Sequence, residues 1–337
     1  METSRVLARP GLRTLARPGW RAGLGIALSI VAGQPRLWLL GMVGFCLRGG
    51  LLLLTLPIVV IPTQVEARLL IGNYLGSTGF SPSFWGVLAL AATAAALVTM
   101  GVLLVLARVE LSAFQTLIED DATADGTGFQ PIRPAGLARR QLFLRLLGVQ
   151  VLTFLALIAS AAPLVWAVAQ KSFDEITRPA SSAPIYERVL GGVGDQLFLF
   201  LVALVVIEML SALTSRELLT RAVGWREPNA SHRLWLLPAL ASAAIRTIRS
   251  PLRTVGTAAM AWVATAAVVI PALWAIGLAW SAVRGAFLTS VSFSDLGDNI
   301  GMVLVAFGLA AAFLVAICIC GFSSALRAAL WSVNRLR

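Results

Sequence analysis

Two ionisable side chains of opposite sign, Arg48 and Glu208, fall deep inside apolar stretches of the sequence. Arg48 follows Arg36 by 12 residues, and Glu208 precedes Arg216 by 8. On helices these spacings place the two charges about 18 Å and about 12 Å from the flanking arginines. A lone charge at the centre of a membrane costs about 2.5–3.5 kcal/mol on insertion scales. We therefore predict an intramembrane Arg48–Glu208 ion pair, which either holds two helices together or serves as a transport or proton site.

The other reactive residue types do not group into a site. His232 is the only histidine, and no cysteine or carboxylate cluster accompanies it. Cys46, Cys318 and Cys320 all fall in apolar stretches, and the last two lie about 200° apart on a helix. No nucleophile–base pair or Asp-rich metal motif is present. The sequence therefore predicts no catalytic site, no metal and no cofactor, and we expect a protein that is not an enzyme.

Three prolines lie within apolar stretches, at Pro57, Pro163 and Pro271. Proline removes one hydrogen bond from a helix and tends to kink it. The kinks either shape helix packing or expose backbone carbonyls to a polar cavity, and the sequence leaves both interpretations open.

The composition shows what surrounds these residues. The chain of 337 residues is 58% apolar and only 13% charged, with a net charge of +11. A soluble domain has roughly 45–50% apolar and about 25% charged residues. These values exclude a soluble enzyme and a disordered chain. Nucleic-acid binding is not expected either, because no aromatic interleaving or recognition motif accompanies the basic residues.

Six apolar stretches have the roughly 20 residues that a helix needs to cross a bilayer. All are predicted to be helices, because backbone polar groups in lipid must be satisfied within their own segment. The fold class is therefore all-α, a polytopic membrane bundle of six transmembrane helices. The predicted spans are 37–61, 84–107, 142–169, 196–215, 255–280 and 299–321.

The basic residues orient these spans. Of the 27 lysines and arginines, 21 fall in the terminal segments and alternate loops of one side, and 5 fall on the other. The positive-inside rule places the richer side, with both termini, in the cytoplasm. All but Lys171 of these residues are arginines, which in an Ala- and Leu-rich chain suggests a high-GC bacterium. We therefore expect a multi-pass protein of the bacterial cytoplasmic membrane.

The spans form three helical hairpins that we interpret as a parallel threefold repeat of about 108 residues. Arg36, Arg145 and Arg253 enter the odd spans at spacings of 109 and 108. Arg108, Arg216 and Arg327 follow the even spans, and Pro163-x-x-Trp166 matches Pro271-x-x-Trp274. The hairpins cover 36–119, 137–218 and 251–337; the intervening parts are a basic segment 1–35, a linker 120–136 and an amphipathic segment 219–250.

Amphipathic helices are expected on the cytoplasmic side. Residues 234–252 carry an apolar face beside arginines, and 109–119 carry a stripe of Leu111, Phe114 and Ile118. Such helices lie in the membrane interface with arginines at headgroup level. The N-terminal arginines either bind anionic inner-leaflet lipid in the same way or only orient the chain. The predicted headgroup contacts are Arg9, Arg13, Arg17, Arg21, Arg246, Arg249 and Arg253.

The first span carries Arg48-Gly49-Gly50 and then Leu56-Pro57-Ile58-Val59-Val60-Ile61-Pro62-Thr63. With these residues it resembles uncharacterised six-span membrane proteins of high-GC bacteria. More distantly, the three Arg-flanked hairpins are similar to the membrane domain attached to some glycerophosphodiester phosphodiesterases. The resemblance implies no activity, because no such catalytic domain is found in the chain.

Two classes of function remain. The favoured one is a non-enzymatic membrane component that organises lipid or supports a membrane protein partner. The alternative is a small-molecule or ion transporter that uses Arg48 and Glu208 as a midplane site. Transporters usually gather polar groups from several helices near the midplane, and few are found in this sequence.

Overall fold

The structure is a computed structural model that describes residues 20–59, 69, 72, 81–125, 136–177, 185–222, 236–290 and 296–336. Every regular element in these ranges is a helix, as predicted. The elements are α1 (Trp20–Gly33), α2 (Pro35–Phe45), η1 (Cys46–Gly50), α3 (Leu51–Thr55), η2 (Leu56–Ile58), α5 (Pro82–Asp125), α6 (Gly136–Thr177), α7 (Ile185–Gly192), α8 (Gly194–Ala222), α9 (Leu236–Arg249), α10 (Pro251–Ser290) and α11 (Leu296–Leu336).

The six predicted spans are confirmed as helical segments that are long and apolar enough to cross a membrane. They indicate a multi-pass membrane protein. Each agrees with its predicted range to within a few residues at one end or both, and the even spans continue further past their predicted cytoplasmic ends. The segments are Pro35–Ile58, Pro82–Leu117, Arg139–Thr177, Gly194–Ala222, Pro251–Phe287 and Val303–Val333.

The chain divides into two compact units. The first unit comprises Met1–Val59, Leu106–Leu146 and Ala212–Arg337, and the second comprises Val60–Val105 and Leu147–Ser211. Helices α5, α6 and α8 each contribute one part to the first unit and another part to the second.

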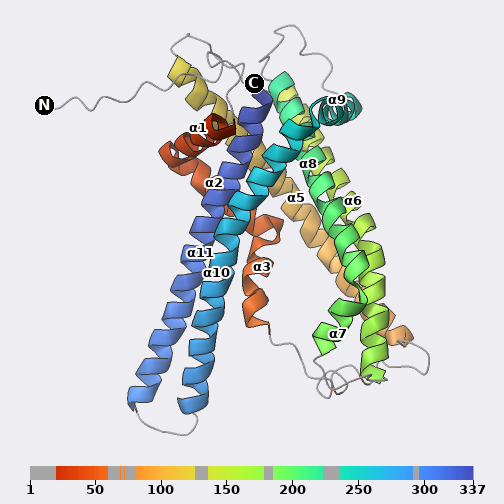
Figure 1. Ribbon diagram of the computed structural model, residues 1–337, viewed down its shortest axis with the longest axis vertical. Coiled ribbons are helices and arrows are strands. Elements are labelled where there is room, and N and C mark those ends of the chain that lie inside the picture. The colour runs from red at the N-terminus through yellow and green to blue at the C-terminus, as the bar shows by residue number, and fades with distance from the viewer. Residues whose placement is uncertain are drawn as a thin grey trace, which may run out of the picture. The chain divides into compact units, whose positions relative to one another are not determined.

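The core of the first unit forms around the last hairpin. Helices α10 and α11 pack side by side, and α1 and α2 pack on α11 (Figure 1). The first span adds Phe45 and Leu54 to a buried cluster that also holds Val269, Ile276 and Cys320. The predicted segment 1–35 thus contains a packed helix, α1, because its Ala27, Ile30 and Val31 are buried.

Two glycines allow α2 and α11 to cross at backbone contact. A Cβ atom on Gly321 would lie 2.8 Å from Met42 Cα and 2.9 Å from Met42 N. A Cβ atom on Gly41 would lie 2.9 Å from Ala325 Cβ. Small residues at helix crossings are the usual means by which membrane helices approach closely, since lipid supplies no hydrophobic driving force between helices. The two glycines therefore permit the close packing of the first span against α11.

The first span is a broken helix. The π-helical turn η1 separates α2 from α3, and Arg48 (φ −82°, ψ 17°) and Gly49 (φ 88°, ψ 7°) leave helical geometry inside it. Only glycine adopts such a positive φ readily, so Gly49 makes the break possible. Non-helical backbone at membrane depth is tolerated where protein buries it or where it lines a cavity.

The prolines of the odd spans occupy different settings. Pro163 and Pro271 lie inside the helices α6 and α10, and the kinks predicted there stay a prediction. Pro57 instead lies in the 3-10 turn η2 that ends the first span. The Leu53 carbonyl that this proline would leave without a partner accepts a hydrogen bond from the Leu56 N–H. The break at Gly49, rather than Pro57, interrupts the first span.

The prediction of a separate interfacial helix over 109–119 is wrong. Helix α5 runs without interruption from Pro82 to Asp125. Leu111 and Phe114, which we expected to face lipid, are buried within the first unit. No glycine or proline occurs between Gly101 and Gly126, so the chain has no residue that would end the helix at the membrane boundary.

The second unit is held together by polar contacts as well as by apolar packing. Thr153 on α6 donates a hydrogen bond from its Oγ1 to Ser211 Oγ on α8 at 2.8 Å. Arg188 on α7 forms an ion pair with Glu175 on α6, with Nη1 and Oε2 2.9 Å apart. Helix α7 was not predicted, because its 8 residues are too few for a membrane span.

Candidate functional site

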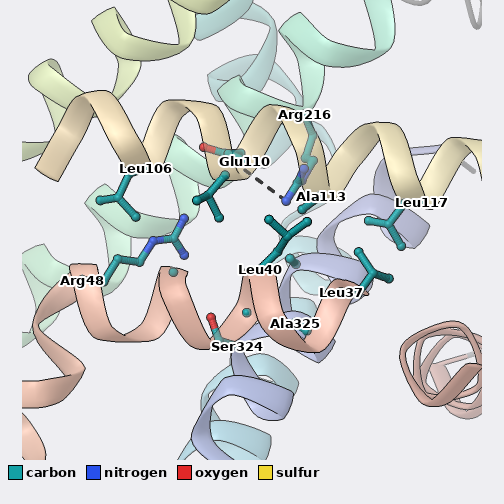
Figure 2. A pocket seen from close by; sticks show the side chains of 14 residues that line it. Leu37, Leu40, Arg48, Leu106, Glu110, Ala113, Leu117, Arg216, Ser324 and Ala325 are labelled. Carbon is teal, nitrogen blue, oxygen red and sulfur yellow. Dashed lines mark ion pairs between the residues drawn. The ribbon is translucent and has the colours of Figure 1, made fainter. Parts of the chain in front are cut away.

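A small cavity of about 40 Å³ in the first unit brings together three charged side chains. Arg48 reaches it from the break in the first span, Glu110 from α5 and Arg216 from α8. In Figure 2, Arg48 and Arg216 approach from different helices, and both point toward the stretch of α5 that holds Glu110. The remaining lining is mainly apolar, with Leu40 and Leu106 among the residues that face the cavity.

Glu110 and Arg216 form a deeply buried ion pair. Arg216 Nη2 lies 3.9 Å from Glu110 Oε1, and the two side chains are only 5% and 7% exposed. This contact is long for a charge-assisted hydrogen bond, which is usually about 2.7–2.9 Å. The Nε and Nη1 atoms of Arg216 are buried and have no hydrogen-bond partner among the described residues. Two nitrogen atoms of a buried cation, which carry three N–H groups, thus lack an acceptor in a residue that lines the cavity.

Three arginines that follow the even spans share a second kind of contact. The guanidinium carbons of Arg108, Arg216 and Arg327 each lie over an aromatic ring. Such cation–π contacts are worth about 0.5–1 kcal/mol at exposed sites and more where water is excluded. The rings are Phe143 at 5.6 Å, Phe114 at 5.6 Å and Trp262 at 5.0 Å from the respective guanidinium carbons.

The position of Arg48 gives the site an excess of positive charge. The cavity lining includes two guanidinium groups and one carboxylate. In a medium of low dielectric such unbalanced charge is costly, so the arrangement suits an added anion and not a cation.

The residues predicted to form the ion pair and the headgroup contacts lie in several different parts of the chain. Arg48 lines the cavity of the first unit, while Glu208 belongs to the second unit, so their pairing stays a prediction. Arg249 is exposed on α9, and Arg246 is half-buried there. Arg253 lies in the first turn of α10. The residues Arg9, Arg13 and Arg17 and the side chain of Arg21 lie outside the described part of the chain.

Glu110 is the site residue that sequence reasoning missed. It lies directly before Leu111 and is not part of the apolar stripe predicted over 109–119. The signal that could have found it is the unbroken helical stretch after Gly101, which carries Glu110 into the protein beside Phe114. No local pattern could have linked it to Arg216, which is 106 residues away.

No family model, no curated protein and no solved structure matches the chain. Among the described residues, no group of three or more His, Cys, Asp or Glu side chains is placed to hold a metal ion.

Proposed function

We propose that this protein is a non-enzymatic component of a bacterial cytoplasmic membrane, with both termini in the cytoplasm, that organises anionic lipid and supports a membrane protein partner. The observation that carries the proposal is the amphipathic helix α9. Its buried residues, Ala239 and Ala243, are small, whereas Leu237 and Ile248 are large and are 72% and 78% exposed. A helix that turns its larger apolar side chains outward is suited to contact lipid.

The direction of α9 supports an interfacial location. In Figure 1, α9 is seen nearly end-on, while α10, on which it packs, and α11 run along the picture. If α10 and α11 cross the membrane, α9 lies close to the membrane plane. Arg246 and Arg249 occupy its last turn, where they would meet headgroup phosphates of the inner leaflet.

Neutralising these arginines tests the proposal. In detergent micelles, Arg246→Gln with Arg249→Gln should weaken binding of phosphatidylglycerol by roughly tenfold or more, since each arginine contributes about 1 kcal/mol near an anionic surface. Bound lipid is counted by native mass spectrometry. Arg284→Gln is the matched control, because Arg284 is exposed on α10 in the part of the chain predicted to face the other side. Equal lipid binding by all three proteins would contradict the proposal.

A threefold repeat of helical hairpins is also proposed as the architecture. It is supported by the three arginines that follow the even spans at nearly constant spacing, Arg108, Arg216 and Arg327. Trp166 and Trp274, which share the Pro-x-x-Trp spacing, are both exposed on their helices. Tryptophan in such positions is typical of the membrane interface.

A transporter that uses Arg48 and Glu208 is the second candidate function. The observation in its favour is the broken first span, because discontinuous membrane helices commonly form transport sites. Against it, the cavity at Arg48 has a volume of only about 40 Å³.

The predicted Arg48–Glu208 pair separates the two functions. If the pair is structural, Arg48→Ala alone should strongly reduce the yield of folded protein, and adding Glu208→Ala should restore it. If it is a transport site, both variants should fold, and ion flux into proteoliposomes should fall by an order of magnitude or more. Folded yield is measured by size-exclusion chromatography. Normal yield and unchanged flux in both variants would refute the pairing.

A further inference from the structure

We propose that the cavity between Arg48, Glu110 and Arg216 is a binding site for a single phosphate-type oxyanion. The inference concerns a site separate from α9 and goes beyond the lipid-organising function. The ligand chemistry is a phosphate group, which either a lipid headgroup or a free phosphate could supply.

Arg216 supplies the donors for this site. Its side chain is 5% exposed, yet Nε and Nη1 have no hydrogen-bond partner among the described residues. A buried donor without a partner loses its hydration and gains nothing in return, and the loss is larger for a charged group. The ring of Phe114 beneath the guanidinium group attracts the charge but offers no lone pair to these N–H groups. An oxyanion in the cavity, whose lining includes Arg216, would provide an acceptor for this guanidinium group.

The charge balance favours an anion over water. With two arginines and one glutamate, the lining has one uncompensated positive charge at neutral pH. Waters could satisfy the free N–H groups, but they would not neutralise this charge. One bound anion would do both.

Geometry and size favour an oxyanion. A guanidinium group presents its N–H donors as a planar fork that matches the oxygens of phosphate or carboxylate. The cavity volume of about 40 Å³ is a few times the roughly 10–15 Å³ required for one water. Ser324 on α11 also lines the cavity and adds a hydroxyl group that can donate to a bound oxygen (Figure 2).

The position of the site on the chain suggests how a phosphate reaches it. The lining extends from Leu37, near the start of the first span, to Arg48 within it. In the predicted orientation, the Leu37 end lies at the cytoplasmic boundary. Both the headgroups of the inner leaflet and phosphate from the cytoplasm are found at this level.

The test measures stabilisation of the full chain in dodecyl maltoside micelles, which contain no phosphate. In one arm, inorganic phosphate replaces chloride at constant ionic strength; in the other, phosphatidylglycerol is added in phosphate-free buffer. A ligand that binds only the folded protein raises its thermal midpoint with concentration. We expect at least one arm to raise the midpoint of the unmodified protein.

Variants locate the effect in the cavity. Arg48→Gln, and Glu110→Gln with Arg216→Gln, should each weaken the response by roughly tenfold to a hundredfold, the equivalent of one charge-assisted hydrogen bond or more. The second variant keeps the net charge unchanged and leaves no unpaired carboxylate, which favours folding. The α9 variant, Arg246→Gln with Arg249→Gln, should respond to inorganic phosphate like the unmodified protein.

The two arms distinguish the source of the phosphate group. A response to inorganic phosphate indicates that a free anion can occupy the site, whereas a response to phosphatidylglycerol alone indicates a lipid headgroup. The proposal is overturned if neither probe changes the midpoint of the unmodified protein. It is also overturned if the cavity variants respond as the unmodified protein does, or if the α9 variant loses the response to phosphate.

Discussion

Replacing Gly321 by leucine is expected to force α2 and α11 apart and to lower the free energy of unfolding by about 3 kcal/mol or more. Even a Cβ atom at this position would come within 2.8 Å of Met42 Cα, closer than real Cβ atoms approach. The Met42 side chain also lies in the way, but the backbone atoms of Met42 obstruct the position as well, so a rotamer change cannot relieve the clash. The loss is measured by titrating sodium dodecyl sulfate into the protein in mixed micelles.

Gly301→Leu is the matched control for this variant. Gly301 lies on the same helix, and a Cβ atom built there meets nothing within 4 Å. Its replacement should be neutral or slightly stabilising, because glycine is disfavoured inside helices by about 1 kcal/mol relative to alanine. If the two leucine variants unfold at the same detergent concentration, α2 and α11 do not cross as the structure shows.

This contrast shows which features of the fold could be predicted from the sequence. The six spans follow from hydropathy, because lipid requires long apolar helices wherever the backbone crosses. The contact between Gly41 and Gly321 does not follow, because many glycines occur in the spans and nothing local distinguishes them. Gly297 and Gly301 have the GxxxG spacing that is typical of close helix packing in membranes, yet a Cβ atom on Gly301 would meet nothing within 4 Å.

The break at Arg48 had a usable signal. Two glycines directly follow an arginine inside an apolar stretch, and both charge and glycine disfavour an ordinary membrane helix there. The positive φ of Gly49 is the structural reason for the glycine at that position. We predicted an ion-pair partner for Arg48 from its charge, but we did not predict that the glycines would allow the backbone to leave helical geometry there.

The buried pair of Glu110 and Arg216 had no such signal. A membrane boundary is where charged residues are expected, so Arg216 was interpreted as an ordinary boundary residue and Glu110 was not considered. Their burial depends on α5 continuing past the boundary and on three helices packing around it in the first unit. Contacts of that kind join residues far apart in the chain, and sequence spacing carries no information about them.

Removing one member of this pair is the second large expected effect. Glu110→Gln leaves the Arg216 guanidinium in a buried site without its carboxylate, which should lower the free energy of unfolding by about 3–5 kcal/mol. Adding Arg216→Met removes the stranded charge and keeps an apolar contact with the Phe114 ring, so the double variant should recover most of the loss. The measurement is a double-mutant cycle by detergent titration in phosphate-free buffer, so that no bound oxyanion substitutes for the carboxylate.

The pair of Glu217 and Arg221 on α8 provides a comparison that tests whether burial or distance controls how much an ion pair stabilises the protein. Its Nε and Oε1 atoms are 2.9 Å apart, compared with 3.9 Å between Arg216 and Glu110, so distance alone would make it the stronger pair. However, the Arg221 side chain is 32% exposed, and a pair of this helical spacing on an accessible surface contributes about 0.3–0.5 kcal/mol. We therefore expect a coupling energy several times larger for the buried pair, because water does not screen it. Equal coupling energies in the two cycles would mean that water reaches Arg216. Water would then hydrate its N–H groups, and the proposed oxyanion would not be needed as their acceptor.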